Sequence, residues 1–267
     1  MSEIKVNSIK GVAASTAALT INNTDGTCTA NLTNRTNKNL IINGAMQVAQ
    51  RGTSSTVSGY GTVDMFRPFY SGTDEAPTQA QADVASGTTP YTSGFRKSLK
   101  ITNGNQTSGA GTADVIEFAT KLEAQDIANS GWNYTSASSF ITLSFWVKSS
   151  VAQNFYGQLV TTDGTSQNYP FETGSLSADT WTKITKTIPG NSNLQFDNNA
   201  NKGIDIKWIM FRGSDTTGSV SLNAWAANNN SVRVPNNTST WYTTNDATFE
   251  VTGVQLEVGS VATDFEH

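Results

Sequence analysis

The sequence predicts an all-β fold, an antiparallel β-sandwich preceded by a short extended N-terminal arm. Its 267 residues include 38 Thr, 28 Ser, 26 Asn and 22 Gly, together 43%, whereas charged residues supply only 14%. Ordinary soluble domains hold roughly 25% charged residues, and helical bundles need far more Leu, Ala, Glu and Lys. Hydrophobic residues make up 36%, enough for a thin core between two sheets. Several segments also alternate apolar and polar residues with the period of a β-strand.

The predicted arm covers residues 1–38, and the sandwich domain covers residues 39–267. Short β-prone pieces at residues 4–9 and 18–21 of the arm are separated by polar turns that contain glycine. These pieces are too small to bury a core alone, so we expect the arm to pair with another chain or with a larger assembly. A leader without fixed structure is the alternative.

Strand signals and turn residues follow one another through the domain and predict about eight to ten strands. The alternation is strongest at residues 141–148, and residues 204–211 are apolar enough for a strand buried on both faces. The predicted strands are residues 40–42, 98–102, 141–148, 155–160, 183–188, 204–211, 220–224 and 249–258.

The last strand changes phase at Gly253. Phe249 and Val251 are at odd positions, whereas Val254 and Leu256 are at even ones. One extra residue with glycine at the kink is how a β-bulge keeps both halves of a strand facing one core. We therefore predict a bulge at Gly253.

Residues 113–129 fit the alternating pattern less well. A strand followed by a helical turn near residues 123–128 is the favoured interpretation, and a short amphipathic helix is the alternative.

Charge and composition exclude several classes of function. A net charge of −4 and a pI near 5.0 argue against nucleic-acid binding. No apolar run approaches the roughly 18 residues needed to span a bilayer, and the first ten residues do not resemble a secretory signal. Cys28 is the only cysteine and His267 the only histidine, which disfavours disulfides, thiolate zinc sites and histidine-based catalysis. We expect no enzyme activity, no cofactor and no membrane insertion.

Carboxylates are the remaining catalytic candidates. Glu117, Glu123 and Asp126 lie close in sequence, and two of them could act as the acid and base of a glycosidase if they lay roughly 5–10 Å apart across a sugar cleft. Acidic side chains on a solvated strand face are the commoner arrangement, so we assign no catalytic residue.

A weak metal candidate lies in the Asn-rich run at residues 197–205. Asp197, Asn199, Asn201 and Asp205 place oxygen ligands at alternate positions, as calcium loops do. Trp208 stands where a bidentate glutamate is needed, so a plain polar turn is the better interpretation and no metal is expected.

Aromatic residues in polar loops are the candidate glycan contacts. Neutral sugars stack on aromatic rings while amides and carboxylates bind their hydroxyls. Packing within the protein or at a subunit interface is the alternative, and it is the default for Trp146, Trp181 and Trp208, which lie in or beside strong strands. The candidates are Trp225, Trp241 and Tyr242 in residues 223–245, and Trp132 and Tyr134 in a similar loop.

Two phrases carry a resemblance to a known family. Residues 39–53 (NLIINGAMQVAQRGT) and 252–267 (TGVQLEVGSVATDFEH) resemble bacteriophage virion proteins, mostly tail-fibre or receptor-binding proteins. Residues 98–102, 145–148 and 178–181 match the interior pattern of that family, which is similar to jelly-roll carbohydrate-binding modules. Residues 64–67 (DMFR) depart from the Asp-Arg-Trp common in the family, and its members tend to continue past Phe-Glu-His.

The resemblance implies a jelly-roll body, a homotrimer, and an arm at residues 1–38 that contacts other virion proteins. We therefore expect a structural and adhesive component of the phage particle, in the tail or a fibre rather than the head, that contacts host surface glycans multivalently. The alternatives are a purely structural collar, adaptor or head-decorating fibre, a carbohydrate-binding module of a secreted bacterial protein, and a depolymerase.

Overall fold

The computed structural model describes residues 6–10, 12, 19–21, 24, 28–30 and 38–266. The chain divides into two units, Met1–Asn37 and Lys38–His267. In the first unit β1 (Ser8–Ile9), β2 (Leu19–Ile21) and β3 (Cys28–Ala30) form an antiparallel sheet in the order β1-β2-β3. Residues 1–5, 11, 13–18, 22–23, 25–27 and 31–37 of the predicted arm and His267 lie outside the described residues. The pairing of the arm with another chain stays a prediction.

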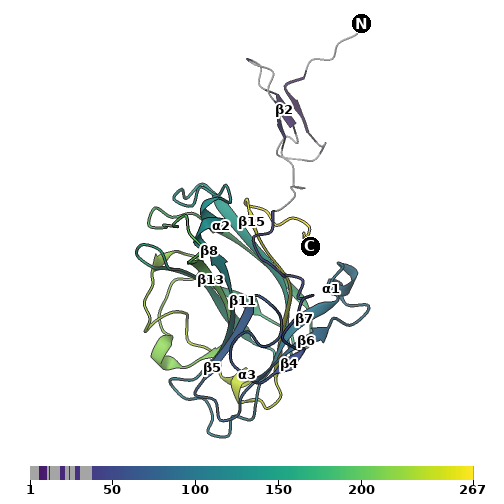
Figure 1. The fold of residues 1–267 in the computed structure, drawn as a ribbon, viewed down its shortest axis with the longest axis vertical. Helices are drawn as coiled ribbons and strands as arrows, with labels where there is room; N and C mark the ends of the chain where they lie inside the picture. Colours follow the sequence, from purple (N-terminus) through teal and green to yellow (C-terminus); the bar gives the residue numbers. More distant parts are fainter. Residues whose placement is uncertain are drawn as a thin grey trace. The chain divides into compact units, whose positions relative to one another are not determined.

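The second unit is an antiparallel β-sandwich, which confirms the predicted fold class (Figure 1). The first of its two six-stranded sheets, here the β13 sheet, has the order β14-β11-β10-β13-β8-β5, and the other, the β15 sheet, has the order β12-β9-β15-β7-β6-β4. The strands are β4 (Ser54–Ser55), β5 (Phe66–Ser71), β6 (Thr78–Asp83), β7 (Lys97–Thr102), β8 (Val115–Glu123), β9 (Phe140–Ser149), β10 (Asn154–Thr161), β11 (Gln167–Ser175), β12 (Thr182–Pro189), β13 (Lys202–Arg212), β14 (Ala226–Ala227) and β15 (Thr248–Val258).

Helical structure in the described residues is confined to single turns, α1 (Thr89–Thr92), α2 (Ala124–Ala128), α3 (Thr240–Thr243) and the 3-10 turn η1 (Ser214–Thr216). The favoured interpretation of residues 113–129 is confirmed, because β8 runs directly into α2. None of the helices described is both long and apolar enough to cross a membrane.

Aromatic rings fill the space between the two sheets. Trp208 of β13 stacks on Phe118 of β8 with ring centroids 5.0 Å apart and meets Phe145 of β9 edge-on at 5.5 Å. All three side chains are buried. Each such ring buries far more area than an aliphatic side chain, so few hydrophobic residues suffice for this core.

Two predicted strands are wrong. Residues 40–42 form a turn, because the Asn39 side chain accepts the amides of Ile41 and Leu256 in place of a regular ladder. Residues 220–224 form a loop, in which Asn223 adopts φ +57° and donates its amide to the carbonyl of Pro170.

The predicted bulge in β15 is confirmed. The register of β15 against β9 shifts between Thr252 and Gln255, and Gly253 has φ +62°, the left-handed region that favours glycine. A Cβ at Gly253 would also lie 2.6 Å from the ring of Phe95. The amide of Val254 then leaves the ladder and donates to the carbonyl of Gly44 at 2.9 Å.

We expect Gly253→Ala to lower the free energy of unfolding by about 2–3 kcal/mol, measured by urea denaturation, because it adds a steric clash to an unfavourable φ. Gly174→Ala is the matched control, since Gly174 has φ +72° but open space around it, and should cost only about 1 kcal/mol. Equal losses in the two variants would contradict the tight contact with Phe95.

Candidate functional site

A hollow of about 250 Å³ opens on the outer face of the β15 sheet. Its floor comes from β9 and the bulge of β15, one side from β12, and the other from the segment after α1 and the C-terminal tail. We call it the Trp146 hollow, and it is lined by Ser93, Phe95, Ser144, Trp146, Lys183, Gly253, Thr263, Asp264 and Phe265.

The alternation of β9 places Trp146 outside the core. Phe145 and Val147 are fully buried between the sheets, so Trp146 points to the other face, where it stays half-buried. It lies opposite Lys183 of β12 and Thr252 of β15. Its ring lines the hollow, and its indole N–H makes no hydrogen bond to any described residue.

Two charged side chains at the hollow also have no partner of opposite charge in the described part of the chain. Lys183 and Asp264 are both exposed, and neither forms an ion pair there. Ser144 and Thr263 add hydroxyl groups to the lining. The hollow therefore combines an apolar ring with a cation, a carboxylate and neutral hydrogen-bonding groups.

Buried polar residues hold the C-terminal tail over β15. Glu257 accepts the amide of Thr263 at 2.8 Å and its hydroxyl at 2.6 Å, and Gln255 accepts the amide of Glu266 at 2.8 Å. Gln255 donates to Glu257 at 2.8 Å, so the two side chains form one network. Since both are almost fully buried, this wall of the hollow is preorganised.

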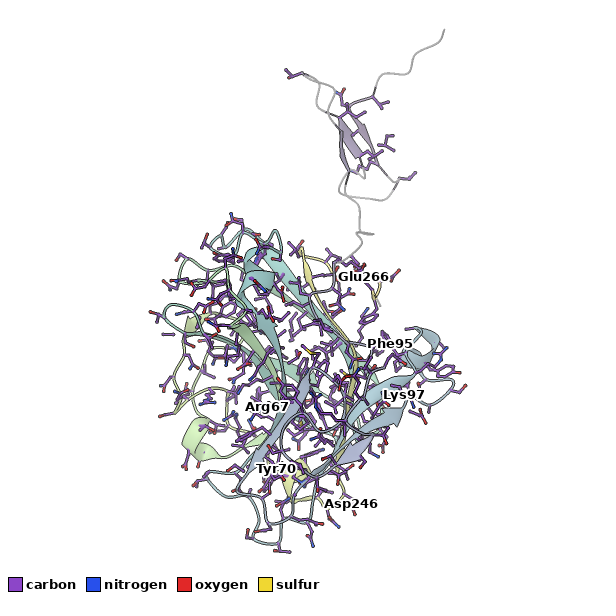
Figure 2. All side chains as sticks on the ribbon, viewed as in Figure 1. Arg67, Tyr70, Phe95, Lys97, Asp246 and Glu266 are labelled. Atoms are coloured by element: carbon purple, nitrogen blue, oxygen red, sulfur yellow. The ribbon has the colours of Figure 1, made fainter. Side chains whose placement is uncertain are left out.

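The segment after α1 packs against the tail through aromatic contact. The rings of Phe95 and Phe265 meet edge-on with centroids 4.8 Å apart. Phe95 and Glu266 are labelled in Figure 2, where they show the segment after α1 and the tail on the same side of the domain. A site of this kind can bind a small polar ligand with one apolar face.

The structure corrects three of the predicted glycan contacts. Trp132, Trp241 and Tyr242 are buried in the core, with exposed fractions of 3%, 0% and 1%. The indole of Trp241 donates to the carbonyl of Thr248 at 3.0 Å, and the Tyr242 ring stacks on Phe211 at 4.4 Å. Covered rings offer no face to a sugar, so packing, the alternative left open above, accounts for them.

The other two predicted contacts are half-buried and lie elsewhere. Trp225 donates its indole N–H to the carbonyl of Pro189 at 2.7 Å and packs on Tyr169. Tyr134 meets Phe196 edge-on at 4.9 Å. Neither lines the Trp146 hollow. The signal that could have found the hollow is the outward position of Trp146 in the alternation of β9.

The Asn-rich run at residues 197–205 folds as a turn and the start of β13. Asn199 accepts the amide of Asn201 at 2.9 Å, Asp197 accepts from Gln195, and Asp205 pairs with Lys202 at 2.7 Å. No group of three His, Cys, Asp or Glu residues that could hold a metal occurs in the described residues.

The candidate catalytic carboxylates do not converge. Glu123 is exposed and six residues along β8 from Glu117, which corresponds to about 20 Å, and Asp126 lies on α2. Glu117 is buried on the outer side of β8, where Arg212 binds it at 2.6 Å and Lys207 at 2.9 Å. Burial alone would raise the pKa of Glu117, but these two cations outweigh it and hold the pKa below the ordinary value.

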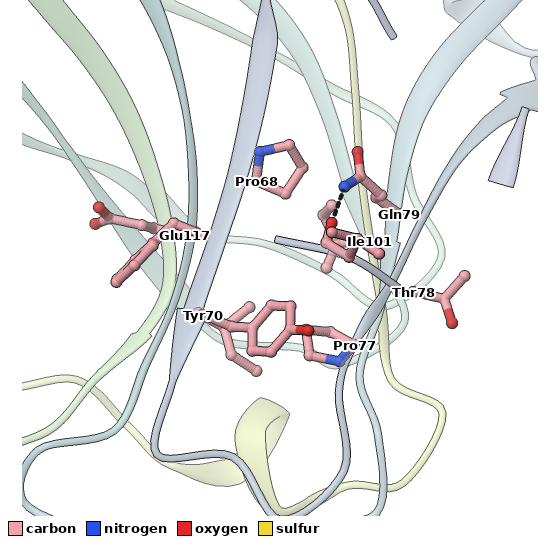
Figure 3. Close-up of a pocket in the computed structure, with 10 residues that line it drawn as sticks. Pro68, Tyr70, Pro77, Thr78, Gln79, Ile101 and Glu117 are labelled. Atoms are coloured by element: carbon pink, nitrogen blue, oxygen red, sulfur yellow. Dashed lines mark hydrogen bonds between the residues drawn. The ribbon is translucent and has the colours of Figure 1, made fainter. Parts of the chain in front are cut away.

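A narrow crevice at the end of the sandwich is too small for a ligand. Figure 3 shows it between Pro68 and Tyr70 of β5 and the start of β6, with Gln79 donating to the carbonyl of Val57 at 2.6 Å. Its volume is about 10 Å³. That is close to the space of one water molecule.

No protein-family model and no curated protein matches this chain. Solved structures do resemble it. The enzymatically active domain of tailspike protein 4 from bacteriophage CBA120 has 8% identity and a TM-score of 0.41 over 83% of this chain, which spans 21% of that chain.

Two carbohydrate-binding domains also resemble the chain. The N-terminal cellulose-binding domain of β-1,4-glucanase C from Cellulomonas fimi has 9% identity and a TM-score of 0.37, covering 81% of this chain and 99% of that one. The family 11 carbohydrate-binding module of Lic26A-Cel5E from Clostridium thermocellum has 12% identity and a TM-score of 0.34, with 77% and 95% covered. At these scores no functional conclusion rests on the likeness.

We expect Glu117→Gln to lower the free energy of unfolding at pH 7 by about 3 kcal/mol, because it leaves two cations without their buried carboxylate. The folded-state pKa lies below the ordinary value of 4.5, so this stabilisation is present above that value and is lost as pH falls through the folded-state pKa. Urea denaturation across pH 2–7 measures it, with Glu123→Gln as the exposed control on the same strand. Loss of hydrolysis of host polysaccharide in Glu117→Gln, with stability unchanged, would contradict this role.

Proposed function

We propose that this protein is a non-enzymatic adhesion component of a bacteriophage particle that binds host surface glycans through the Trp146 hollow. The observation that carries the proposal is the half-buried Trp146 ring, which lies on an outer sheet face among unpaired Lys183 and Asp264. A pyranose has an apolar face that stacks on an indole ring. Its hydroxyls both donate and accept, so they suit an ammonium group and a carboxylate at once.

A single shallow site of this size supports only weak binding, and avidity supplies the rest. Linked copies convert later binding events into intramolecular ones and raise the overall affinity by factors of about 100 to 10,000. The homotrimer implied by the family resemblance would provide three such sites. The uncharged polar surface suits both glycan contact and packing between subunits.

The placement of the acidic groups supports a role without catalysis. Glu117 is held ionised between Arg212 and Lys207, which removes its capacity as a general acid. Glu123 lies too far along β8 to act with it. We therefore propose that the protein acts by contact with the glycan and not by cleaving it.

The two phrases that resemble phage virion proteins support the assignment to a particle, in the tail or a fibre. The first phrase begins at Asn39, whose amide donates to Glu266 of the second phrase at 3.1 Å, and the second phrase supplies one wall of the hollow. In this proposal residues 1–38 connect the domain to other virion proteins.

We expect Trp146→Ala to reduce binding to an array of bacterial surface oligosaccharides about tenfold or more, because the variant removes the stacking surface. Trp181→Ala is the matched control. Trp181 is also half-buried and directly precedes the adjacent strand β12, but it does not line the hollow. Thermal unfolding of both variants checks that the fold is retained. Binding unchanged in Trp146→Ala, or lost equally in both variants, would contradict the assignment of the site.

Deletion of residues 1–38 tests the place in the particle. We expect the truncated protein to be absent from purified particles while its glycan binding per chain is retained, and the full chain to have the mass of a trimer in solution. Normal incorporation of the truncated protein would contradict the anchoring role.

A further inference from the structure

Part of the outer face of the β13 sheet is polar, yet it is buried. Leu159, Tyr169 and Ile206 face the core, so the alternation turns Gln158, Asn168 and Asp205 to the opposite side of the same strands. Their exposed fractions are only 0%, 3% and 6%. Outward-facing polar side chains normally reach water, so a second layer must cover this face.

Four polar groups on this face have no hydrogen-bond partner. They are Nε2 and Oε1 of Gln158, Oδ1 of Asn168 and Oδ1 of Asp205. Val160 pairs with both Asn168 and Asp205, and Gln158 is two residues from Val160 on the same strand, so the groups lie on one face of three neighbouring strands. Buried polar groups in proteins are almost always paired, and each exception calls for an explanation.

The covering layer includes residues 228–237, which we call the strap. The carbonyl of Arg233 accepts from the Asn168 side chain at 2.7 Å, and the Asn237 side chain accepts the amide of Arg212 at 2.7 Å. The strap therefore crosses the face from β11 towards the end of β13. It is drawn in yellow-green beyond the outer side of β13 in Figure 1.

The strap is held to the domain mainly by hydrogen bonds and buries little apolar surface. Val234 is its only fully buried hydrophobic side chain, and the rest is mainly Asn, Ser, Arg and Pro. Its backbone hydrogen bonds with other segments join Asn228 to Ser166 at its start, and Arg233 to Thr216 and Val234 to Gly218 in the loop after β13. A segment that buries little apolar surface opens at low free-energy cost compared with the core.

We infer that the face beneath the strap is a second ligand site, specific for neutral polyhydroxylated sugars, that becomes available when the strap lifts. Three of the four unpaired groups are acceptors, so the ligand must offer donors. Sugar hydroxyls donate and accept and can satisfy all four, whereas a carboxylate only accepts and cannot. The site lies on the opposite sheet from the Trp146 hollow and does not depend on it.

The test is Gln158→Leu, with wild type and Trp146→Ala beside it on an array of neutral and uronic-acid oligosaccharides. Gln158 is completely covered, so its replacement affects binding only if the face opens. The neutral sugars that still bind to Trp146→Ala identify ligands of the second site. We expect Gln158→Leu to bind those sugars at least tenfold more weakly than wild type does. The melting temperature should not fall, because an unpaired amide is replaced by an apolar group of similar size.

Gln79→Leu is the matched control, because Gln79 is as buried but its side-chain amide is bonded to Val57 and Gly59, and its loss should lower the melting temperature. Hydrogen exchange of wild type in the strap gives a readout that needs no variant. We expect the exchange of residues 228–237 to change when a neutral sugar from the array is added. Unchanged binding in Gln158→Leu, or unchanged strap exchange at saturating sugar, would overturn the second site and leave the Trp146 hollow unaffected.

Discussion

The left-handed backbone at Gly253 is the constraint on which the domain depends. It inserts one residue into a central strand, so that Val251 and Val254 both reach the core although their positions differ in parity. The same step turns the amide of Val254 to Gly44, which joins the first segment of the domain to its last strand. It also places glycine beneath Phe95, so the floor of the Trp146 hollow can approach that ring closely.

Neutral polar side chains hold the turns and loops of this domain in place by hydrogen bonds to the backbone. Asn103 donates to the carbonyls of Trp241, Tyr242 and Thr244, and it thereby fixes the turn that carries two buried rings. The Asn39 side chain accepts the amides of Ile41 and Leu256, and it thereby joins the turn after it to β15. A composition rich in Asn, Thr and Ser is therefore compatible with an ordered domain, because such side chains satisfy loop backbone groups.

The alternation of apolar residues predicts β7, β9, β13 and β15, including the bulge, because each of these strands packs against the core along its whole length. It misses β5 and β11, which contain Pro68 and Pro170. Proline usually ends a strand, but β5 is an edge strand and β14 pairs only with the first two residues of β11, so neither proline leaves a ladder bond unmade.

The site is harder to predict than the fold. Trp146 can be placed on the outer face from the alternation alone, but its exposure depends on a tail that folds back over β15 through Gln255 and Glu257. No apolar or polar periodicity indicates that contact, because it joins side chains of β15 to backbone amides of the tail. Trp241 was predicted to be exposed but is buried, because a polar sequence around a ring does not reveal that a short turn covers it.

The two ends of the sandwich domain lie next to each other. The amides of Lys38 and Asn39 both donate to the carboxylate of Glu266, so the two ends of this unit are in direct contact. A unit with adjoining ends can be inserted into a surface loop of another protein, or circularly permuted, without stretching the host chain. The sandwich is thus suited to insertion as a module into another chain.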